Sequence, residues 1–358
     1  MIFRKTRFSG DDWVTLYVRT HPVTSPGKLN NGNSRKNRVG VIGSFVWDVI
    51  HGRDPSQAPV EEWGGITYAL GGIDAALPDD WEFVPLAKVG FDVAAKAREF
   101  LRGMEHVAPD GEPIEVPHPN NRVTLYYQSA ERRCEIMGGG IPGWSWLGLK
   151  PLLNDLDALY INLISGFELD LEVAQHIRAH FRGPIYCDMH SLLLARQPDG
   201  MRTLQPLLNP EAWMRCFDFV QVNEDEMSMM AADPLALAAL AMGAGVKVLN
   251  VTMGQRGVVY FAAPGFDRLN DLERGKLLAG PPGPLRTELI SAVPARDLAG
   301  GDPTGCGDVW GATYFSRLLA GDDIRTAMRA AGKAAARNVD HRGASGLARY
   351  LRGELTVR

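Results

Sequence analysis

The residues best suited to chemistry lie in one glycine-rich run near the C-terminus. Residues 300–312 read Gly-Gly-Asp-Pro-Thr-Gly-Cys-Gly-Asp-Val-Trp-Gly-Ala and lead into an apolar helical run at 314–319. Small residues let backbone N–H groups converge, and a helix that begins there adds its positive dipole end, so this run predicts an anion pocket. Asp308 directly follows the residues whose amides would face the anion. Its carboxylate could therefore deprotonate a hydroxyl beside a phosphate, or it could be an ordinary helix cap.

The same run lacks the marks of other nucleotide-binding motifs. The Gly-Lys-Ser/Thr of a Walker A loop is absent, and the glycine spacing is not that of the dinucleotide-binding G-x-G-x-x-G pattern. Asp308 would also repel the pyrophosphate of a dinucleotide. These observations argue against an NAD-dependent oxidoreductase.

Composition limits the class of partner. The chain has 358 residues, and Lys plus Arg number 38 against 42 for Asp plus Glu, a net charge of −4. A balance this even does not predict nucleic acid as a partner, so we expect a small molecule. The four cysteines form no C-x-x-C pair. This pattern favours reduced thiols over a disulfide framework or a zinc ribbon.

We expect a cytoplasmic protein that does not bind a membrane. The N-terminal residues contain no apolar signal-peptide core, and the most apolar stretch, 234–251, is broken by Gly243, Gly245 and Lys247. A membrane span needs about 20 mostly apolar residues, which this stretch cannot supply.

The elements that must position the loop alternate along the chain. Short apolar, β-branched runs predict strands, and helix-length segments at 92–101, 169–181 and 225–242 separate several of them. This alternation predicts an α/β fold with a mostly parallel sheet covered on both faces, whose ligands lie at the carboxyl ends of the strands. The predicted strands are 39–46, 83–89, 158–163, 184–187, 217–222, 246–252 and 258–262.

Three further segments depart from this alternation. Residues 20–38 are rich in turn-forming residues, so we expect 1–38 to be a flexible N-terminal extension. The stretches 52–63 and 111–140 resemble strands with turns but contain no helix pattern between them. We expect them to pair as a small extra sheet.

With these elements in place, the sequence resembles the PfkB (ribokinase-like) family of carbohydrate kinases. The run 302–308 is similar to the family's D-T-x-G-A-G-D signature, and other landmarks follow in the family's order. They are a first strand ending in Asp48, the pair Gly64-Gly65, a G-x-D turn at 90–92, N-x-x-E at 223–226, T-x-G-x-x-G at 252–257 and His-Arg-Gly-Ala at 341–344, which resembles the closing R-x-G-A turn. Together they span about residues 39–346.

The resemblance implies one kinase core rather than the roughly two domains that a length of this size suggests. It implies an αβα sandwich over 39–352, a mostly parallel central sheet flanked by helices, with a small β lid near 52–63 and 111–140 and a tail at 353–358. The implied reaction is ATP-dependent phosphorylation of a hydroxyl of a sugar or sugar-like substrate.

The resemblance also implies a role for each matching residue. Asp308 would be the general base, and the amides of Gly305, Cys306 and Gly307 would form the anion hole. Asp48, Gly64 and Gly65 would bind the substrate, and Asn223, Thr252, Gly254 and Gly257 would bind ATP. Glu226 would hold Mg²⁺ through water, and Asp302 would contribute to a monovalent-cation (K⁺) site.

Two departures from the family pattern leave the acceptor open. Ala69 stands where the family has a sugar-binding Asn after Gly64-Gly65, and Asp188-Met189-His190-Ser191-Leu192 replaces D-x-N-x-R. The alternatives are therefore a nucleoside kinase, which the aromatic residues Trp47, Tyr68 and Trp144 would suit, and a non-catalytic sugar or nucleotide sensor. A homodimer formed through the lid is a further expectation from the family.

Overall fold

The structure is a computed structural model that describes residues 35–51, 58–127, 133–276, 284–296 and 301–355. The described residues from Lys36 onward form one compact unit, and the fold below is that of this unit. Residues 1–34 of the predicted extension, parts of both predicted lid segments (52–57 and 128–132) and 356–358 of the predicted tail lie outside the described residues.

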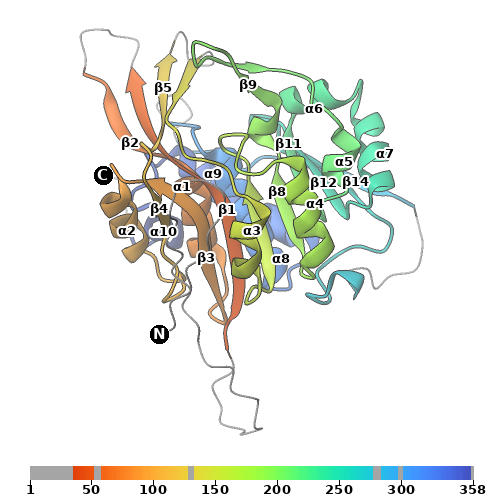
Figure 1. Ribbon diagram of the computed structural model, residues 1–358. Coiled ribbons are helices and arrows are strands. Elements are labelled where there is room, and N and C mark those ends of the chain that lie inside the picture. Colours follow the sequence, from red (N-terminus) through yellow and green to blue (C-terminus); the bar gives the residue numbers. More distant parts are fainter. Residues whose placement is uncertain (1–34, 52–57, 128–132, 277–283, 297–300, 356–358) are drawn as a thin grey trace, which may run out of the picture. The chain divides into compact units, whose positions relative to one another are not determined.

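A mostly parallel sheet forms the centre of this unit (Figure 1). Its order is β14-β13-β12-β11-β8-β7-β1-β3-β4, and only the β12–β13 and β13–β14 pairs are antiparallel. The prediction of a mostly parallel sheet is thus confirmed. The strands are β1 (Asn37–His51), β3 (Trp81–Gly90), β4 (Ile114–Val116), β7 (Ala158–Asn162), β8 (Ile185–Asp188), β11 (Phe219–Asn223), β12 (Val248–Thr252), β13 (Val258–Ala262) and β14 (Arg286–Ile290).

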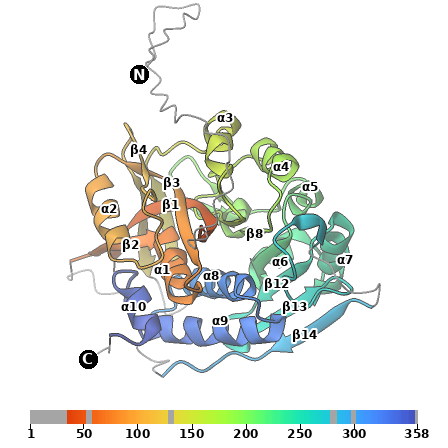
Figure 2. The same cartoon turned by 90° about the horizontal axis from the view of Figure 1, so that it is seen from below.

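Helices cover both faces of the sheet, as Figure 2 shows from below. One hydrophobic cluster joins the sheet to α1 (Ile66–Ala76), α2 (Ala94–Arg102), α8 (Cys306–Leu319), α9 (Ile324–Val339) and α10 (Leu347–Arg352). A second cluster, on the other face, includes residues of α3 (Trp146–Leu149), α4 (Leu171–His180), α5 (Pro210–Met214), α6 (Glu224–Met230) and α7 (Pro234–Ala244). Burial of these apolar side chains is the main stabilising term for such layers.

The lid grows out of the central sheet through one long strand. The first part of β1 pairs with β3 and β7, and its second part, from Phe45 to His51, pairs with β2 (Val60–Gly65) and β5 (Asn121–Tyr127). Strand β6 (Arg133–Gly138) completes this small sheet beside β5. A hairpin of β9 (Leu194–Arg196) and β10 (Arg202–Leu204) meets β6 through a bridge between Ile136 and Met201. The lid and the central sheet therefore share β1.

Two expectations about elements differ from the structure. Strand β4 lies within the stretch that we expected to form the extra sheet, but it pairs in parallel with β3 at the edge of the main sheet. The predicted helix 225–242 is two helices: the first ends at Met230, and Asp233 caps the second by accepting the N–H groups of Leu235 and Ala236. Pro234 occupies the first position of α7, where its missing N–H costs nothing.

Short 3-10 helices complete the described elements: Lys150–Leu153, His190–Leu193, Gly254–Arg256 and Arg274–Lys276. Among the described residues no single helix has the length and hydropathy of a membrane span. Helices α6 and α7 reach that length and hydropathy only when taken together, and the chain bends by 72° between them.

Candidate active site

The glycine-rich loop leads into the first turn of α8. Gly305 takes the N-cap position in the left-handed region (φ 74°), and Asp302 Oδ1 accepts the N–H of Thr304 from 2.9 Å. The ring of Tyr68 lies against Gly305, where a Cβ would come within 2.2 Å of the ring. A side chain larger than hydrogen therefore fits neither the backbone angle nor the space at this position.

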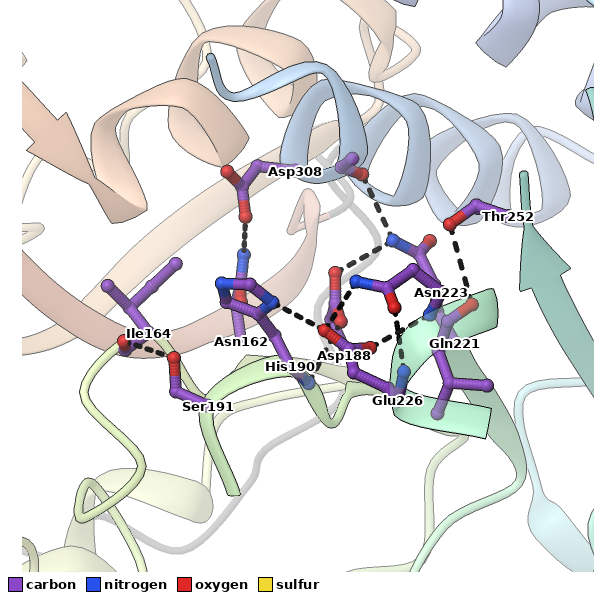
Figure 3. A network of polar contacts seen from close by, with 12 residues as sticks. Asn162, Ile164, Asp188, His190, Ser191, Gln221, Asn223, Glu226, Thr252 and Asp308 are labelled. Carbon is purple, nitrogen blue, oxygen red and sulfur yellow. Dashed lines mark hydrogen bonds and ion pairs between the residues drawn. The ribbon is translucent and has the colours of Figure 1, made fainter. Parts of the chain in front are cut away.

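Asp308 lies in this first turn, at the carboxyl ends of the central strands (Figure 3). Its Oδ1 accepts a 2.6 Å hydrogen bond from Nδ2 of Asn162, the last residue of β7. The carbonyl oxygen of Asp308 lies 3.4 Å from the hydroxyl of Tyr160 on the same strand. Asp308 makes no side-chain cap of α8, because its N-cap residue is Gly305.

A row of buried polar residues lies beneath this turn. Asn162, Asp188 and Gln221 are register partners on the adjacent parallel strands β7, β8 and β11. Nε2 of Gln221 donates to Asp188 Oδ2 at 2.7 Å and to the carbonyl of Gly307 at 3.1 Å, as Figure 3 shows in part. The row therefore supports the backbone of the predicted anion hole from below.

An ion pair extends this network toward α6. Nδ1 of His190 lies 2.7 Å from Oε1 of Glu226. Burial alone would lower the pKa of His190, but the hydrogen bond and the charge of Glu226, together with Asp188 and Asp308, raise it to about 9. Burial and the neighbouring Glu226 carboxylate raise the pKa of Asp188 well above its usual range. Three carboxylates thus surround one imidazole, and such perturbed groups are typical of functional sites.

Asn223 and Glu226 form a reciprocal capping box at the start of α6. Asn223 Oδ1 accepts the Glu226 N–H at 2.9 Å, and Glu226 Oε2 accepts the Asn223 N–H at 2.8 Å. Thr252 is the register partner of Asn223 on β12. The turn after it contains Gly254 (φ 55°) and Gly257 (φ 100°), both with positive φ angles. The predicted nucleotide residues therefore lie along neighbouring strand ends, β11 and β12.

The predicted substrate residues lie where the lid meets the central sheet. Asp48 on β1 and Glu62 on β2 are direct cross-strand partners. The side chain of Asp48 leans over Gly64, where a Cβ would lie 1.9 Å from its Oδ2, so a larger residue there would displace the Asp48 carboxylate. Gly65 has a φ of 62° and is the N-cap residue of α1.

Tyr68 connects this end of the site with the phosphate loop. Burial raises the pKa of its hydroxyl strongly, and the charges of Glu62, Asp302, Asp48 and Asp308 raise it further. Four of the carboxylates that the fold brings together thus act on one ring. Of these, Glu62 was not predicted from the sequence.

Asp302 faces a second carboxylate rather than carbonyls alone. Burial and the charge of Asp302 raise the pKa of Glu62, and Arg342 acts in the opposite direction. Glu62 packs against Gly343, where a Cβ would lie 1.9 Å from its Oε2. This oxygen-rich set suits a hard cation. Among the described residues, no group of three or more His, Cys, Asp or Glu side chains is arranged to hold a metal ion by itself.

The surroundings of Cys306, the middle residue of the predicted anion hole, disfavour its thiolate. Burial raises the pKa of its thiol to about 11, although Nδ2 of Asn338 lies 3.3 Å from the sulfur and lowers it. Nucleophilic cysteines require a lowered pKa. This setting fits the prediction that Cys306 serves the loop through its backbone amide and its small volume.

The structure brings most predicted residues to one edge of the sheet and adds residues that the sequence did not reveal. Asp308, the anion-hole residues, Asn223 and Glu226 join one network, and Asp48 and Asp302 approach it through Tyr68. Asn162, Gln221 and the ion-pairing role of His190 were missed. A polar residue within an otherwise apolar run, near its C-terminal end, was the only signal for the first two.

Comparison with known proteins agrees with this geometry. The family model described as pfkB family carbohydrate kinase matches residues 200–349, which contain the phosphate loop and the N-x-x-E motif. The resemblance to the PfkB family is confirmed. This match indicates a phosphotransferase. No curated protein matches the sequence.

Solved structures with the same fold are nearly as long as the described unit. A nucleoside kinase from Burkholderia thailandensis in complex with inosine has 17% identity and a TM-score of 0.64, with 87% of this chain and 93% of that chain covered. A ribokinase from Arabidopsis thaliana with ribose and ATP has 17% identity and a TM-score of 0.60, with 88% and 96% covered. A pyrophosphate-dependent myo-inositol kinase variant has 15% identity and a TM-score of 0.65, with 88% and 98% covered. The ribokinase-like fold is thereby confirmed.

Proposed function

We propose that the chain is an ATP-dependent small-molecule kinase that phosphorylates a hydroxyl of a sugar or sugar-like acceptor. The observation that carries the proposal is the position of Asp308, one residue after the amides of the phosphate loop and held by Asn162. In a phosphoryl transfer the protein mainly positions the reactants and stabilises charge. A carboxylate and converging amides at one helix start meet both needs.

In the proposed reaction Asp308 takes the proton of the acceptor hydroxyl. The hydroxyl oxygen then bonds to the γ-phosphorus as the bond to the ADP oxygen breaks. The amides of Gly305, Cys306 and Gly307, at the positive end of α8, stabilise the charge on the transferring group. Bound Mg²⁺ would neutralise phosphate charge, and Glu226 is placed to hold it through water.

The proposed nucleotide site draws on two strand ends and the turn after the second. Asn223, Thr252, Gly254 and Gly257 lie on neighbouring strand ends and would contact ATP. Asp302 with Glu62 would hold a monovalent cation such as K⁺. The ribokinase fold also occurs in a pyrophosphate-dependent kinase, so pyrophosphate is a donor to test beside ATP.

The charges at the acceptor end support a neutral polyol over a sugar acid. Asp48, Glu62 and Asp308 all act on Tyr68, and carboxylates of the protein repel a carboxylate of the substrate. Two of the three aromatic residues that favoured a nucleoside, the tryptophans, pack against other parts of the chain, and Tyr68 covers Gly305. Trp47 packs edge-on against Trp63 at 5.0 Å, and Nε1 of Trp144 donates to the carbonyl of Leu86. We therefore rank a nucleoside acceptor second.

A donor and acceptor screen tests the proposed function. The chain with Mg²⁺ and ATP is assayed for ADP release with ribose, myo-inositol, inosine and gluconate, each in K⁺ and in Na⁺ buffer. A parallel arm replaces ATP by pyrophosphate and measures phosphate. We expect ribose, myo-inositol or both to raise ADP release at least ~10-fold above the acceptor-free rate, and gluconate to leave it unchanged.

Two other outcomes discriminate between the alternatives. Stimulation by inosine alone would assign a nucleoside kinase. Binding of a sugar or of ATP, seen by calorimetry, without stimulated release from either donor would contradict a kinase and favour a sensor.

A further inference from the structure

Asn162 occupies a position that packing alone does not explain. It ends β7 after four buried residues, and its own exposed fraction is 0%. A buried amide destabilises a strand unless its hydrogen bonds are made. An apolar residue would continue the run and fill this place at less cost, so the amide has a use at the strand end.

The side-chain amide of Asn162 donates a hydrogen bond to the side chain of Asp308. Nδ2 donates to Oδ1 at 2.6 Å, and the two residues are 146 positions apart in the sequence. A hydrogen bond to an ionised acceptor is stronger than one between neutral groups. Because an amide neither gains nor loses a proton near neutral pH, this donor keeps its role while the carboxylate changes state.

We infer that Asn162 is a positioning residue for Asp308: its amide holds Oδ1, so that the proton of the acceptor hydroxyl is delivered to Oδ2. This inference rests on the proposed function. By fixing the rotation of the carboxylate, Asn162 keeps the base aligned with a hydroxyl that enters beside the phosphate loop. Alignment of this kind is a large part of catalysis, because small misplacements of reacting groups are costly.

The backbone of α8 does not depend on this contact. The hydroxyl of Tyr160 reaches the carbonyl of Asp308 at 3.4 Å, and Nε2 of Gln221 reaches the carbonyl of Gly307 at 3.1 Å. Gly311 lets the next turn pack closely on the sheet, since a Cβ there would lie 2.5 Å from the Tyr186 hydroxyl. The first turn is thus anchored by other residues as well, while Nδ2 of Asn162 holds the carboxylate itself.

The imidazole of His190 is a second group toward which the Asp308 carboxylate could rotate. The charge of Asp308 acts on the imidazole of His190, whose pKa it helps to raise. Without the amide, we expect the carboxylate to rotate toward this cation and away from the loop. The hydrogen bond from Asn162 prevents this rotation.

A double-mutant cycle with a matched control tests the inference. Asn162→Leu removes the donor, and Asn162→Asp keeps the shape while replacing the donor by a carboxylate. Asn250→Leu is the control, because Asn250 has an exposed fraction of 0% and lies on β12 in the same register row as Gln221 and Asp188. Each variant is assayed with MgATP and whichever of ribose, myo-inositol or inosine turns over fastest, and its Tm is measured.

We expect Asn162→Leu and Asn162→Asp to lower kcat by about 10- to 100-fold, with KM for ATP and for the acceptor within about threefold. Asn250→Leu replaces an equally buried amide on β12 and should leave kcat within about threefold. When Asn162→Leu is added to an Asp308→Asn variant, kcat should fall by less than about twofold further, because the effect of Asn162 passes through the carboxylate that is already lost.

The failures of the two proposals are distinguishable. If Asp308→Asn alone does not lower turnover, the proposed function fails. If it does, but Asn162→Leu and Asn162→Asp both keep kcat within threefold, the inference is overturned. A full loss from Asn162→Leu in the Asp308→Asn background, or an equal loss from Asn250→Leu, would assign Asn162 a structural role and overturn it as well.

Discussion

At the scale of single residues, the phosphate loop depends on one glycine and the ring that covers it. Gly305 has a φ of 74°, and Tyr68, with an exposed fraction of 2%, fills the space where a side chain would lie. The left-handed conformation costs other residues about 1 kcal/mol or more, and forcing a methyl group into a packed place costs about 1–3 kcal/mol. The two constraints act together at Gly305.

Gly305→Ala should therefore lower the free energy of unfolding by about 2–4 kcal/mol. Gly321→Ala is the matched control, because Gly321 has a φ of 87° but no atom within 4 Å of its missing Cβ. It should cost only about 1 kcal/mol and leave turnover unchanged. Urea denaturation of both variants measures the difference. Equal losses would show that Tyr68 does not constrain the loop.

The sequence predicted Asp308 but not the residue that holds it. Asp308 stands in a contiguous motif, so its neighbours in the sequence are its neighbours in space. Asn162 lies within an unremarkable apolar run, and its partner lies 146 residues further along the chain. A contact of this kind follows from strand order and register, which a single sequence does not specify.

At the scale of elements, the N-caps of the neighbouring helices α6 and α7 differ in their surroundings. Asn223 caps α6 and belongs to the network that contains Glu226 and His190. Asp233 caps α7 through the N–H groups of Leu235 and Ala236, and it is exposed. The loss of either cap costs about 1 kcal/mol of stability.

Asn223→Ala should raise the KM for ATP and lower kcat, each about 3- to 10-fold, while Asp233→Ala should change neither. Their stability losses should agree within about 0.5 kcal/mol, since each removes one N-cap. Steady-state kinetics with varied ATP, together with urea denaturation, provide the comparison. A similar loss of activity in Asp233→Ala would mean that helix stability, and not contact with the nucleotide, explains the effect.

The elements themselves were predicted well where apolar runs were short and bounded. Strands β12 and β13 begin within two residues of their predicted starts, and both end at the predicted residues. The helix break at Asp233-Pro234 was missed because the apolar pattern continues across it. Strand β4 was assigned to the wrong sheet, because three residues of edge strand carry no signal of their partner.

At the scale of the whole molecule, a buried carboxylate ties α1 to the chain after α2 and to α10. Asp74 has an exposed fraction of 0% and accepts the N–H groups of Glu105 and His106 and a 2.7 Å hydrogen bond from Arg352. Burial alone would raise the pKa of Asp74, but the contacts with His106 and Arg352 lower it. The same carboxylate, 3.7 Å from Nδ1 of His106, raises the pKa of that imidazole.

The raised pKa of His106 determines whether its contribution to folding stability grows or falls with pH. His106 binds a proton more tightly in the folded chain than in the unfolded one, so its contribution is complete below the unfolded pKa of about 6.5. The contribution is lost as the pH rises through the higher folded value. The contribution of Asp74 has the opposite dependence, because its pKa is lowered: it is present above about pH 4 and lost in acid.

We expect the stability difference between wild type and His106→Gln to shrink as the pH rises from 6 toward 9. The change should be about 1 kcal/mol or less, because the two groups are in ion-pair contact at the edge of the buried region. Urea denaturation at each pH measures it. A difference that grows with pH would contradict the direction of the His106 shift.

The architecture followed from the order of motifs more than from any one element. The alternation of strands and helices gave the mostly parallel sheet, and the family resemblance supplied the sandwich and the lid. The sharing of β1 between both sheets could not be predicted, because the sequence of one continuous 15-residue strand does not show where its partner strands change. The pairing of Asp48 with Glu62 depends on that extension.

The most direct test of the central claim is the turnover of Asp308→Asn with MgATP and the fastest acceptor of the screen. Asp323→Asn is the control, because Asp323 is an ordinary N-cap that accepts the N–H of Thr326 at the start of α9. We predict that Asp308→Asn lowers kcat by at least ~10² with an unchanged Tm, as the loss of a general base requires, and that Asp323→Asn keeps its rate. An Asp308→Asn variant that turns over at the wild-type rate would contradict the account.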